Sequence, residues 1–196
     1  MLAVLFGASG VGKSSLLREL EMREDFFGDV SYSPVKDIVK KGLLPDPGLD
    51  VGDLENGLNI LKGVEQYLFQ NGLTAILYAI HSSFAKVFLG RKDNLIVLDR
   101  SFIDTLPYYR LRIGKSHPYE SILLSRFLEM SDIAIHVPPY PGHEARYVRS
   151  GVSDVDEFNS IYTRLREEND KKVVELRSPS IEGRVEELLG ILDTRR

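Results

Sequence analysis

Short runs of apolar residues alternate along the chain with longer segments in which apolar residues recur at helical spacing. The first run, residues 2–6, is apolar throughout, which is typical of a strand buried on both faces of a parallel sheet. A glycine-rich turn follows it. Residues 14–22 then place Leu16, Leu17 and Leu20 on one helical face. This start predicts the strand, turn and helix that open a βαβ unit.

The same alternation continues to the end of the chain and predicts four more strands, at residues 29–33, 94–99, 132–137 and 172–176. Helical spacing predicts further helices at residues 54–70, 74–89, 101–113, 119–130, 155–169 and 181–192. Asn71-Gly72 is expected to cap the first of these helices at its C-terminal end. Residues 40–53 are rich in Gly, Pro and Asp and are expected to form a long loop.

Strands that alternate with helices favour an α/β fold with three layers: an open, mostly parallel, five-stranded sheet with helices on both faces. A length of 196 residues fits one domain, so we expect residues 1–196 to form a single unit. Ligands of such folds bind at the carboxyl ends of the strands. The loops that follow the strands are therefore the places to look for chemistry.

Composition narrows the class of protein. The chain has 43% hydrophobic and 28% charged residues, as in an ordinary soluble domain, and its formal net charge of −4 does not favour nucleic acid or an anionic membrane. It has no cysteine, which excludes disulfides, thiolate metal sites and cysteine nucleophiles. No apolar run reaches the ~20 residues of a membrane span. We therefore expect a cytoplasmic protein without a membrane partner.

The turn after the first strand matches the P-loop pattern in full, as Gly7-x-x-x-x-Gly12-Lys13-Ser14. Glycines let successive backbone N–H groups point at an anion, and the start of the following helix adds its positive end. Lys13 is expected to reach the β- and γ-phosphates of ATP, and the Ser14 hydroxyl to bind Mg²⁺. The expected cradle comprises Gly7, Ala8, Ser9, Gly10, Val11, Gly12, Lys13, Ser14 and Ser15.

Two further groups of residues carry candidate chemistry. Asp99 ends the predicted strand at residues 94–99, where a carboxylate can hold Mg²⁺ or accept a proton, and Arg100 beside it can grip a phosphate. Arg146 and Arg149 lie in the Pro/Gly-rich loop after the next strand. Arginines there can offset charge on a transferring phosphoryl group when the loop closes. We therefore predict a mobile lid at about residues 138–152.

Together the segments GASGVGKS (residues 7–14) and LDRSFIDTLPYY (98–109) and the arginine-bearing loop resemble the nucleoside and nucleotide kinases of the P-loop superfamily. The middle segment is similar to the Asp-Arg motif of thymidylate kinases and to the Glu-Arg-Ser motif of deoxynucleoside kinases. Residues 132 to the end also resemble nicotinamide-riboside-kinase-type P-loop domains. The Asn-Lys-x-Asp segment with which a guanine-specific switch protein reads its base is absent from the sequence.

The resemblance implies roles for single residues. Asp99 would be the general base or a Mg²⁺ partner, Arg100 would contact the transferring or acceptor phosphate, and Tyr108 would lie near the acceptor. Arg149 and Arg146 would be lid arginines. The chain departs from the pattern after the second strand, where Ser33 stands in place of a carboxylate beside Pro34. Lys36 and Asp37 follow closely and could replace that acid.

Other polar residues are given structural interpretations. His81 is expected to pack in the core or on a helix surface, and Arg110 and Arg112 to be solvated charges at a helix end, with contact to an acceptor phosphate as their alternative role.

The leading functional hypothesis is an ATP- and Mg²⁺-dependent phosphotransferase. Its acceptor would be a nucleoside, a nucleoside monophosphate or a related small molecule, and a homodimer is compatible with the resemblance. A second hypothesis is a kinase that acts on a hydroxyl of DNA or RNA, such as a polynucleotide end or a modified base. A third is a nucleotide-dependent switch or assembly ATPase. The sequence leaves open the identity of the acceptor and the choice between ATP and GTP.

Overall fold

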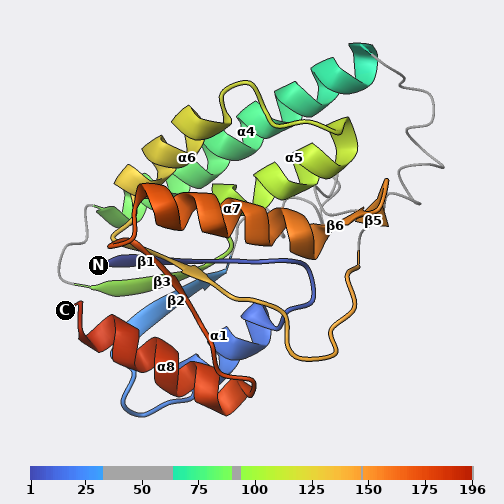
Figure 1. Ribbon diagram of the computed structural model, residues 1–196. Coiled ribbons are helices and arrows are strands. Elements are labelled where there is room, and N and C mark those ends of the chain that lie inside the picture. The colour runs from blue at the N-terminus through green and yellow to red at the C-terminus, as the bar shows by residue number, and fades with distance from the viewer. Residues whose placement is uncertain (33–63, 90–93, 147, 196) are drawn as a thin grey trace.

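Five parallel strands form the central sheet of the computed structural model, which describes residues 1–32, 64–89, 94–146 and 148–195 (Figure 1). Within these residues the strand order is β2-β3-β1-β4-β7, and each neighbouring pair is parallel. The five-stranded α/β sheet expected from the sequence is thus confirmed. The strands are β1 (Leu2–Phe6), β2 (Gly28–Tyr32), β3 (Leu95–Asp99), β4 (Ile133–His136) and β7 (Val173–Glu175).

The three central strands are buried along their whole length, which explains why they are apolar without alternation. β2 lies at one edge of the sheet, and its residues are partly or fully exposed. β1 sits between β3 and β4, so the loop that follows β1 leaves the middle of the sheet. Residues just after β1, β3 and β4 therefore meet at one edge.

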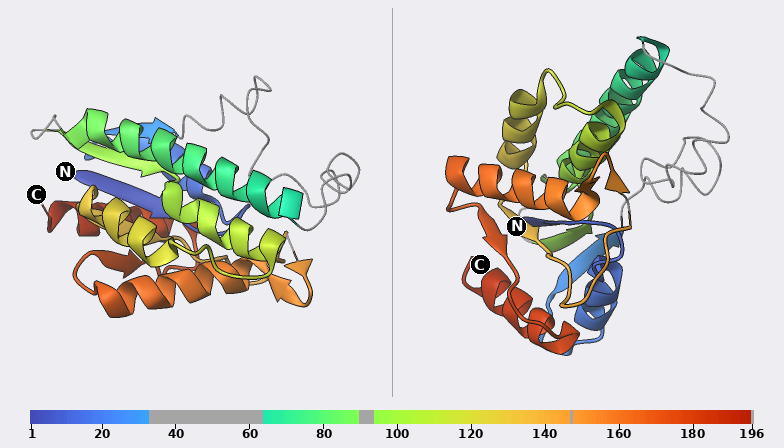
Figure 2. Two further views of the ribbon diagram at one scale, coloured as in Figure 1. Left: turned by 90° about the horizontal axis from the view of Figure 1, so that it is seen from above. Right: turned by 45° about the vertical axis from the view of Figure 1, so that its right-hand side comes forward.

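Helices cover both faces of the sheet, as Figures 1 and 2 show. One face carries α1 (Lys13–Glu21) and α8 (Ile181–Asp193). The other carries α4, α5, α6 and α7, with the short 3-10 helix η1 leading into α5. Among the described residues, no helix has both the length and the apolar character to span a membrane. The helices of this face are α4 (Val64–Leu89), η1 (Phe102–Asp104), α5 (Thr105–Ile113), α6 (Glu120–Glu129) and α7 (Asp154–Glu168).

α4 corrects one expectation, because it runs without a break through Asn71-Gly72. A glycine C-cap of the kind expected here adopts the left-handed conformation, and Gly72 is not among the glycines with positive φ. Instead, the Asn71 side chain donates a hydrogen bond of 2.8 Å to the backbone carbonyl of Tyr67, one turn earlier. Leu73 and Leu77 are buried beyond the predicted break. Packing therefore overrides the local signal, and residues 54–63 of the predicted helix lie outside the described part of the chain.

The segment predicted as an irregular loop after β4 contains a small ribbon. β5 (Val148–Arg149) pairs antiparallel with β6 (Val152–Ser153), and Ser150 and Gly151 form the turn with φ of 52° and 78°. Ser153 then begins α7 through a capping box, in which its hydroxyl accepts from the Asp156 amide and the Asp156 carboxylate accepts from the Ser153 amide. The ribbon thus leads directly into α7.

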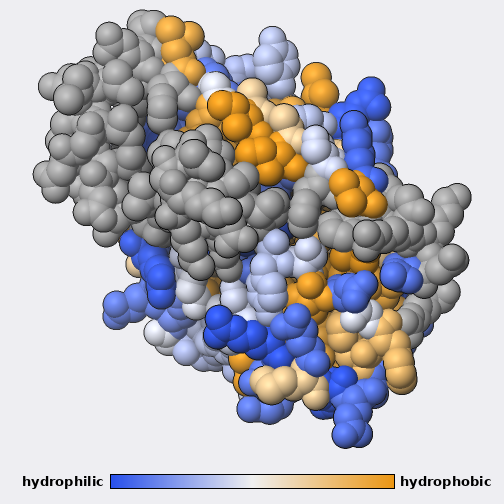
Figure 3. Space-filling model, turned by 180° about the vertical axis from the view of Figure 1, so that it is seen from behind, coloured by the Kyte–Doolittle hydropathy of each residue, from blue (hydrophilic) through white to orange (hydrophobic). Residues whose placement is uncertain are grey.

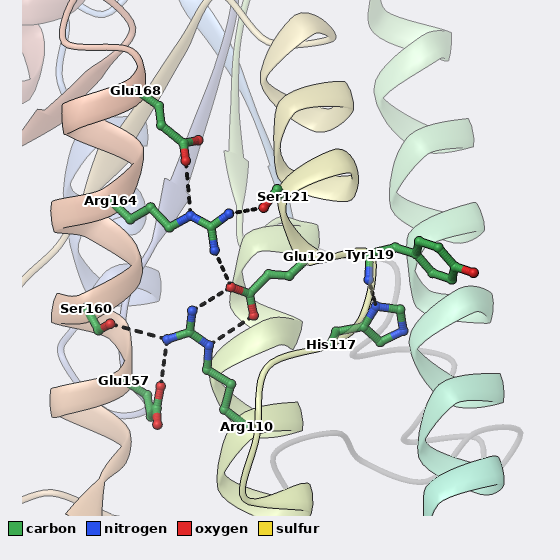
Figure 4. Close-up of polar contacts among 9 residues, drawn as sticks. All are labelled: Arg110, His117, Tyr119, Glu120, Ser121, Glu157, Ser160, Arg164 and Glu168. Atoms are coloured by element: carbon green, nitrogen blue, oxygen red, sulfur yellow. Dashed lines mark hydrogen bonds and ion pairs between the residues drawn. The ribbon is translucent and has the colours of Figure 1, made fainter.

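A buried ionic network ties α5, α6 and α7 together (Figure 4). Glu120 is 2% exposed and accepts hydrogen bonds from Arg110 at 2.9 and 2.5 Å and from Arg164 at 2.7 Å. Arg110 also donates to Glu157 at 3.0 Å. Arg112 is 8% exposed and donates to the side chain of Gln70 at 3.3 Å. The expectation that Arg110 and Arg112 are solvated was wrong, because both bind partners on other elements.

Apolar side chains are exposed on the side of the molecule opposite to that of Figure 1 (Figure 3). On α4, Leu68 is 63% exposed, Ile76 47% and Val87 60%. The opposite side of the helix packs toward the sheet and α5. α4 therefore carries apolar side chains on its exposed face as well as on the face that packs against the sheet, whereas the exposed face of a typical surface helix is polar.

Candidate functional site

The loop between β1 and α1 curls tightly over residues 7–12. Gly12 is the N-cap of α1 and adopts the left-handed conformation, with φ of 86°. Gly7 has φ of 154°, and a β-carbon there would lie 2.4 Å from the Val137 carbonyl oxygen after β4. Ala8 and Val11 are buried in the core, Ser9 is half-buried and Ser15 is exposed. Gly7 and Gly12 of the P-loop pattern thus stand at positions where the backbone conformation would be strained for a residue with a side chain.

Lys13 points back over this loop rather than into solvent. Its side chain is 4% exposed, and its Nζ donates to the Gly7 carbonyl at 2.5 Å and to the Ala8 carbonyl at 2.8 Å. The same Nζ lies 3.8 Å from Oδ1 of Asp104, a residue that sequence reasoning did not select. The ammonium group is therefore held at the centre of the loop.

Ser14 joins the loop to the neighbouring strand. Its hydroxyl donates a hydrogen bond of 3.0 Å to Oδ2 of Asp99, the last residue of β3. Asp99 is fully buried, and it pairs in register with Leu5, close to the end of β1. Parallel pairing of β1 and β3 therefore brings together a hydroxyl and a carboxylate that are 85 residues apart. These are hard oxygen ligands of the kind that Mg²⁺ prefers, so the pair fits that ion.

Two arginines line a cavity beside this pair. Its volume is about 260 Å³, and its lining comprises Gly10, Gly12, Lys13, Ser14, Ser15, Arg100 and Arg146. Arg146 lies so close to the loop that a β-carbon on Gly10 would stand 2.6 Å from its Nε. The structure thus brings Arg100 and Arg146 to the loop that carries Lys13, as the sequence analysis anticipated.

Arg100 has an unusual backbone conformation, with φ of 74°. A non-glycine residue in this region costs about 1–3 kcal/mol, and such residues cluster at functional sites. It immediately follows Asp99 at the end of β3. The positive φ therefore marks the junction at which the chain turns from the strand toward η1.

His81 of α4 adds a neutral group near Arg100. Burial, and to a smaller extent the positive charge of Arg100, lower the pKa of His81 to about 4. The side chain is 7% exposed. Of the two positions expected for His81, core or helix surface, the structure shows the buried one, and the imidazole is uncharged at neutral pH.

Other predicted residues are only partly placed. Tyr108 is 5% exposed, and its ring packs edge-on against Phe158 of α7 at 5.6 Å between centroids. Arg149 lies in β5, and its side chain is outside the described part of the structure. Lys36 and Asp37 lie outside the described residues altogether.

Tyr140 packs beside the glycine loop and Arg184 packs on Tyr140, and sequence reasoning selected neither residue. A β-carbon on Gly12 would lie 2.9 Å from Cε2 of Tyr140. The Arg184 guanidinium of α8 lies over that ring, 3.9 Å from its centroid. Arg184 also donates to the carbonyl oxygens of Pro138 and Ser178, each at 2.8 Å. α8 therefore anchors the segment after β4 against the glycine loop.

No protein-family model matches this sequence, and no curated protein matches it. Solved structures do share its fold. Thymidylate kinase from Ehrlichia chaffeensis aligns with a TM-score of 0.60 and 15% identity over 98% of both chains. Deoxyadenosine kinase from M. mycoides with bound dATP aligns with a TM-score of 0.52 and 13% identity, over 98% of this chain and all of that one.

A third similar structure is the NadR protein in complex with NR. It aligns with a TM-score of 0.57 and 17% identity over 99% of this chain and 50% of the NadR chain. The present chain thus spans about half the length of NadR. At these identities the likeness shows a shared fold and no more, and at the level of the fold it confirms the resemblance stated from the sequence.

Proposed function

We propose that the chain is a phosphotransferase that moves the γ-phosphate of ATP, with Mg²⁺, to a nucleoside, a nucleoside monophosphate or a related small acceptor. The contact between Ser14 and Asp99 beside Lys13 is the observation that carries this proposal. A hydroxyl and a carboxylate so placed can hold the Mg²⁺ of a bound nucleotide in switch proteins as well as in kinases. Arg100 and Arg146 at the same cavity favour a kinase, because they can offset the charge on a transferring phosphoryl group.

The chain's own residues divide the work in this proposal. Backbone N–H groups of residues 7–15 and the start of α1 bind the phosphates, and Lys13 reaches the β- and γ-phosphates. Ser14 and Asp99 would hold Mg²⁺, which when bound neutralises charge on the phosphate oxygens. Asp99 is also suited to accept the proton of an acceptor hydroxyl.

The arginines stabilise charge and exclude water. Arg100 and Arg146 line the cavity at the loop, where two guanidinium groups can offset the charge that spreads over a transferring phosphoryl group. Arg149 is proposed as a further lid arginine, in a mobile lid at about residues 138–152 that closes over the nucleotide while Arg184 holds its first residues to α8. Lys36, Asp37 and Tyr108 are proposed to contact the acceptor.

Incubation with γ-labelled ATP and Mg²⁺ tests this function against a panel of nucleosides, nucleoside monophosphates and nicotinamide riboside. We expect transfer to at least one of these, and none with Lys13→Ala. A parallel set with GTP decides the donor, and oligonucleotides with free hydroxyl ends test the nucleic-acid alternative. Hydrolysis without transfer to any acceptor would contradict the proposal and favour an assembly ATPase.

The exposed apolar residues of α4 support a homodimer as part of this proposal. Light scattering after size exclusion measures the mass directly. A mass of one chain at micromolar concentration would contradict the dimer without affecting the phosphotransferase assignment.

A further inference from the structure

Asp104 reaches across from η1 to the loop that follows β1. Its Oδ1 accepts a hydrogen bond of 3.2 Å from the Gly7 amide and lies 3.8 Å from Nζ of Lys13. Its Oδ2 accepts a hydrogen bond of 2.9 Å from the Ser101 amide. The residue is 5% exposed. One buried carboxylate thus contacts the first glycine of the P-loop, the P-loop lysine and the segment that follows Asp99.

A second capping box in the chain shows what Asp104 does beyond capping. In both boxes a serine hydroxyl accepts a hydrogen bond from a backbone amide of the first turn. The carboxylate of an aspartate three residues later accepts a hydrogen bond from the serine's own backbone amide. At the start of α7, Asp156 uses one oxygen for both contacts with Ser153 and is exposed. Asp104 also caps with one oxygen, but its other oxygen reaches the P-loop. Capping alone does not require a buried residue at this place.

Charge explains why a carboxylate is needed here. Lys13 is 4% exposed, and a buried ammonium group requires an opposite charge as well as hydrogen-bond acceptors. Two carbonyls supply acceptors, and Asp104 supplies the charge. Burial raises the pKa of the Asp104 carboxyl and outweighs the charges of Lys13 and Arg100 and the amides of Ser101 and Gly7, which lower it. These four groups are the ones that favour the ionised carboxylate.

We propose that Asp104 is a positioning residue that holds Lys13 and the start of the P-loop in register with the carboxyl end of β3. The inference rests on the proposed function, because it assigns to Lys13 a role at the nucleotide phosphates. Gly7 is then fixed from two sides, by the Asp104 carboxylate and by the close approach of the Val137 carbonyl. The phosphate cradle and Asp99 move as one rigid unit.

Asp104→Asn tests the proposal, because it keeps the shape of the side chain and removes its charge. We expect the variant to lower kcat by roughly 10- to 100-fold, as misplacement of a reacting group does. It should also weaken ATP·Mg²⁺ binding by roughly tenfold in the otherwise unchanged chain, and by less than about twofold in a Lys13→Ala background. Equal losses in both backgrounds would overturn the proposal, because Asp104 would then act independently of Lys13.

Asp132→Asn is the matched control. Asp132 accepts the Leu2 amide at 2.7 Å, at the opposite end of the same strand β1. Its replacement removes the charge from the same kind of contact, a backbone amide that donates to a carboxylate, and should change stability but not kcat or nucleotide affinity. The unmodified chain is assayed first. No ATP binding by it would refute the proposed function, whereas an active chain with an unaffected Asp104→Asn variant would refute only this inference.

A measurement on the unmodified chain covers the case in which the variant does not fold. The Gly7 amide proton should shift in NMR spectra as Asp104 is titrated with acid, because the bond to its carboxylate weakens. A Gly7 resonance that does not respond to pH would overturn the proposed contact.

Discussion

The ring of Tyr140 lies against Gly12 so closely that a β-carbon on Gly12 would stand 2.9 Å from Cε2 of the tyrosine. The Arg184 guanidinium also packs against this ring, 3.9 Å from its centroid, and so restricts its movement. We therefore expect Gly12→Ala to displace the loop and to weaken ATP·Mg²⁺ binding by at least roughly tenfold, or about 1.4 kcal/mol. Calorimetric titration of the purified variant measures this loss.

Gly114→Ala separates this steric effect from backbone strain. Gly114 has φ of 75°, close to that of Gly12, but a β-carbon there would meet nothing within 4 Å. The substitution should lower the free energy of unfolding by about 1–2 kcal/mol and leave nucleotide affinity unchanged. If both variants lose the same affinity, the contact with Tyr140 is not what makes Gly12 necessary.

Asp99→Asn should affect turnover far more than binding. The amide keeps an oxygen to accept from the Ser14 hydroxyl but cannot take up a proton. We expect kcat to fall by about 10²- to 10⁴-fold, as for loss of a general base, with a much smaller change in the Kd for ATP. Steady-state kinetics and calorimetry on the same preparation measure the two quantities. Near-normal turnover would show that Asp99 is not the base.

His81 should make the fold less stable in mild acid. Burial lowers its pKa to about 4 from the ordinary value of 6.5, so the unfolded chain binds the proton more tightly. The contribution of this group to stability is therefore present above pH 6.5 and is lost as the pH falls toward 4. Between pH 7 and pH 5 the free energy of unfolding should drop by about 2 kcal/mol through this residue.

Urea unfolding of the unmodified chain and of His81→Gln at both pH values isolates this contribution. The glutamine does not titrate, so the difference between the two chains should shrink or reverse at pH 5. Parallel pH profiles for the two chains would show that His81 does not carry the effect.

Glu120→Gln should lower the free energy of unfolding, because it removes the buried negative charge that pairs with Arg110 and Arg164. Removal of one partner from a buried ionic pair typically lowers the free energy of unfolding by about 3–5 kcal/mol. The control is Glu129→Gln, whose partner Arg126 is 67% exposed. That change should stay within about 0.5 kcal/mol. Similar losses in the two variants would contradict the importance of the buried network.

Much of the fold could be predicted because apolar runs report buried strands directly. The runs at β1, β3 and β4 are buried throughout, and the strands lie within a residue or two of the predicted bounds. The P-loop could also be predicted, because its glycines are required by the local backbone conformation and not by contacts with distant segments. Asp99 and Arg100 could be selected as candidates for a related reason, because Asp99 ends an apolar strand and Arg100 follows it.

The remaining features depend on contacts between distant segments. Asn71-Gly72 is a local stop signal, but the packing of Leu73 and Leu77 carries α4 through it. Arg110 could be recognised as paired only once α6 and α7 placed Glu120 and Glu157 beside it. In the sequence Asp104 resembles an ordinary capping residue, and only the folded sheet shows that its second carboxylate oxygen contacts the Gly7 amide. No local pattern encodes such partners.

A calorimetric titration of the unmodified chain and of Lys13→Ala with ATP and Mg²⁺ tests directly whether the P-loop binds a nucleotide. We expect one binding site in the unmodified chain with a Kd of about 1 μM to 1 mM, and clearly weaker binding by the folded variant. Absence of binding heat in the unmodified chain at millimolar ATP and at millimolar GTP would contradict this expectation.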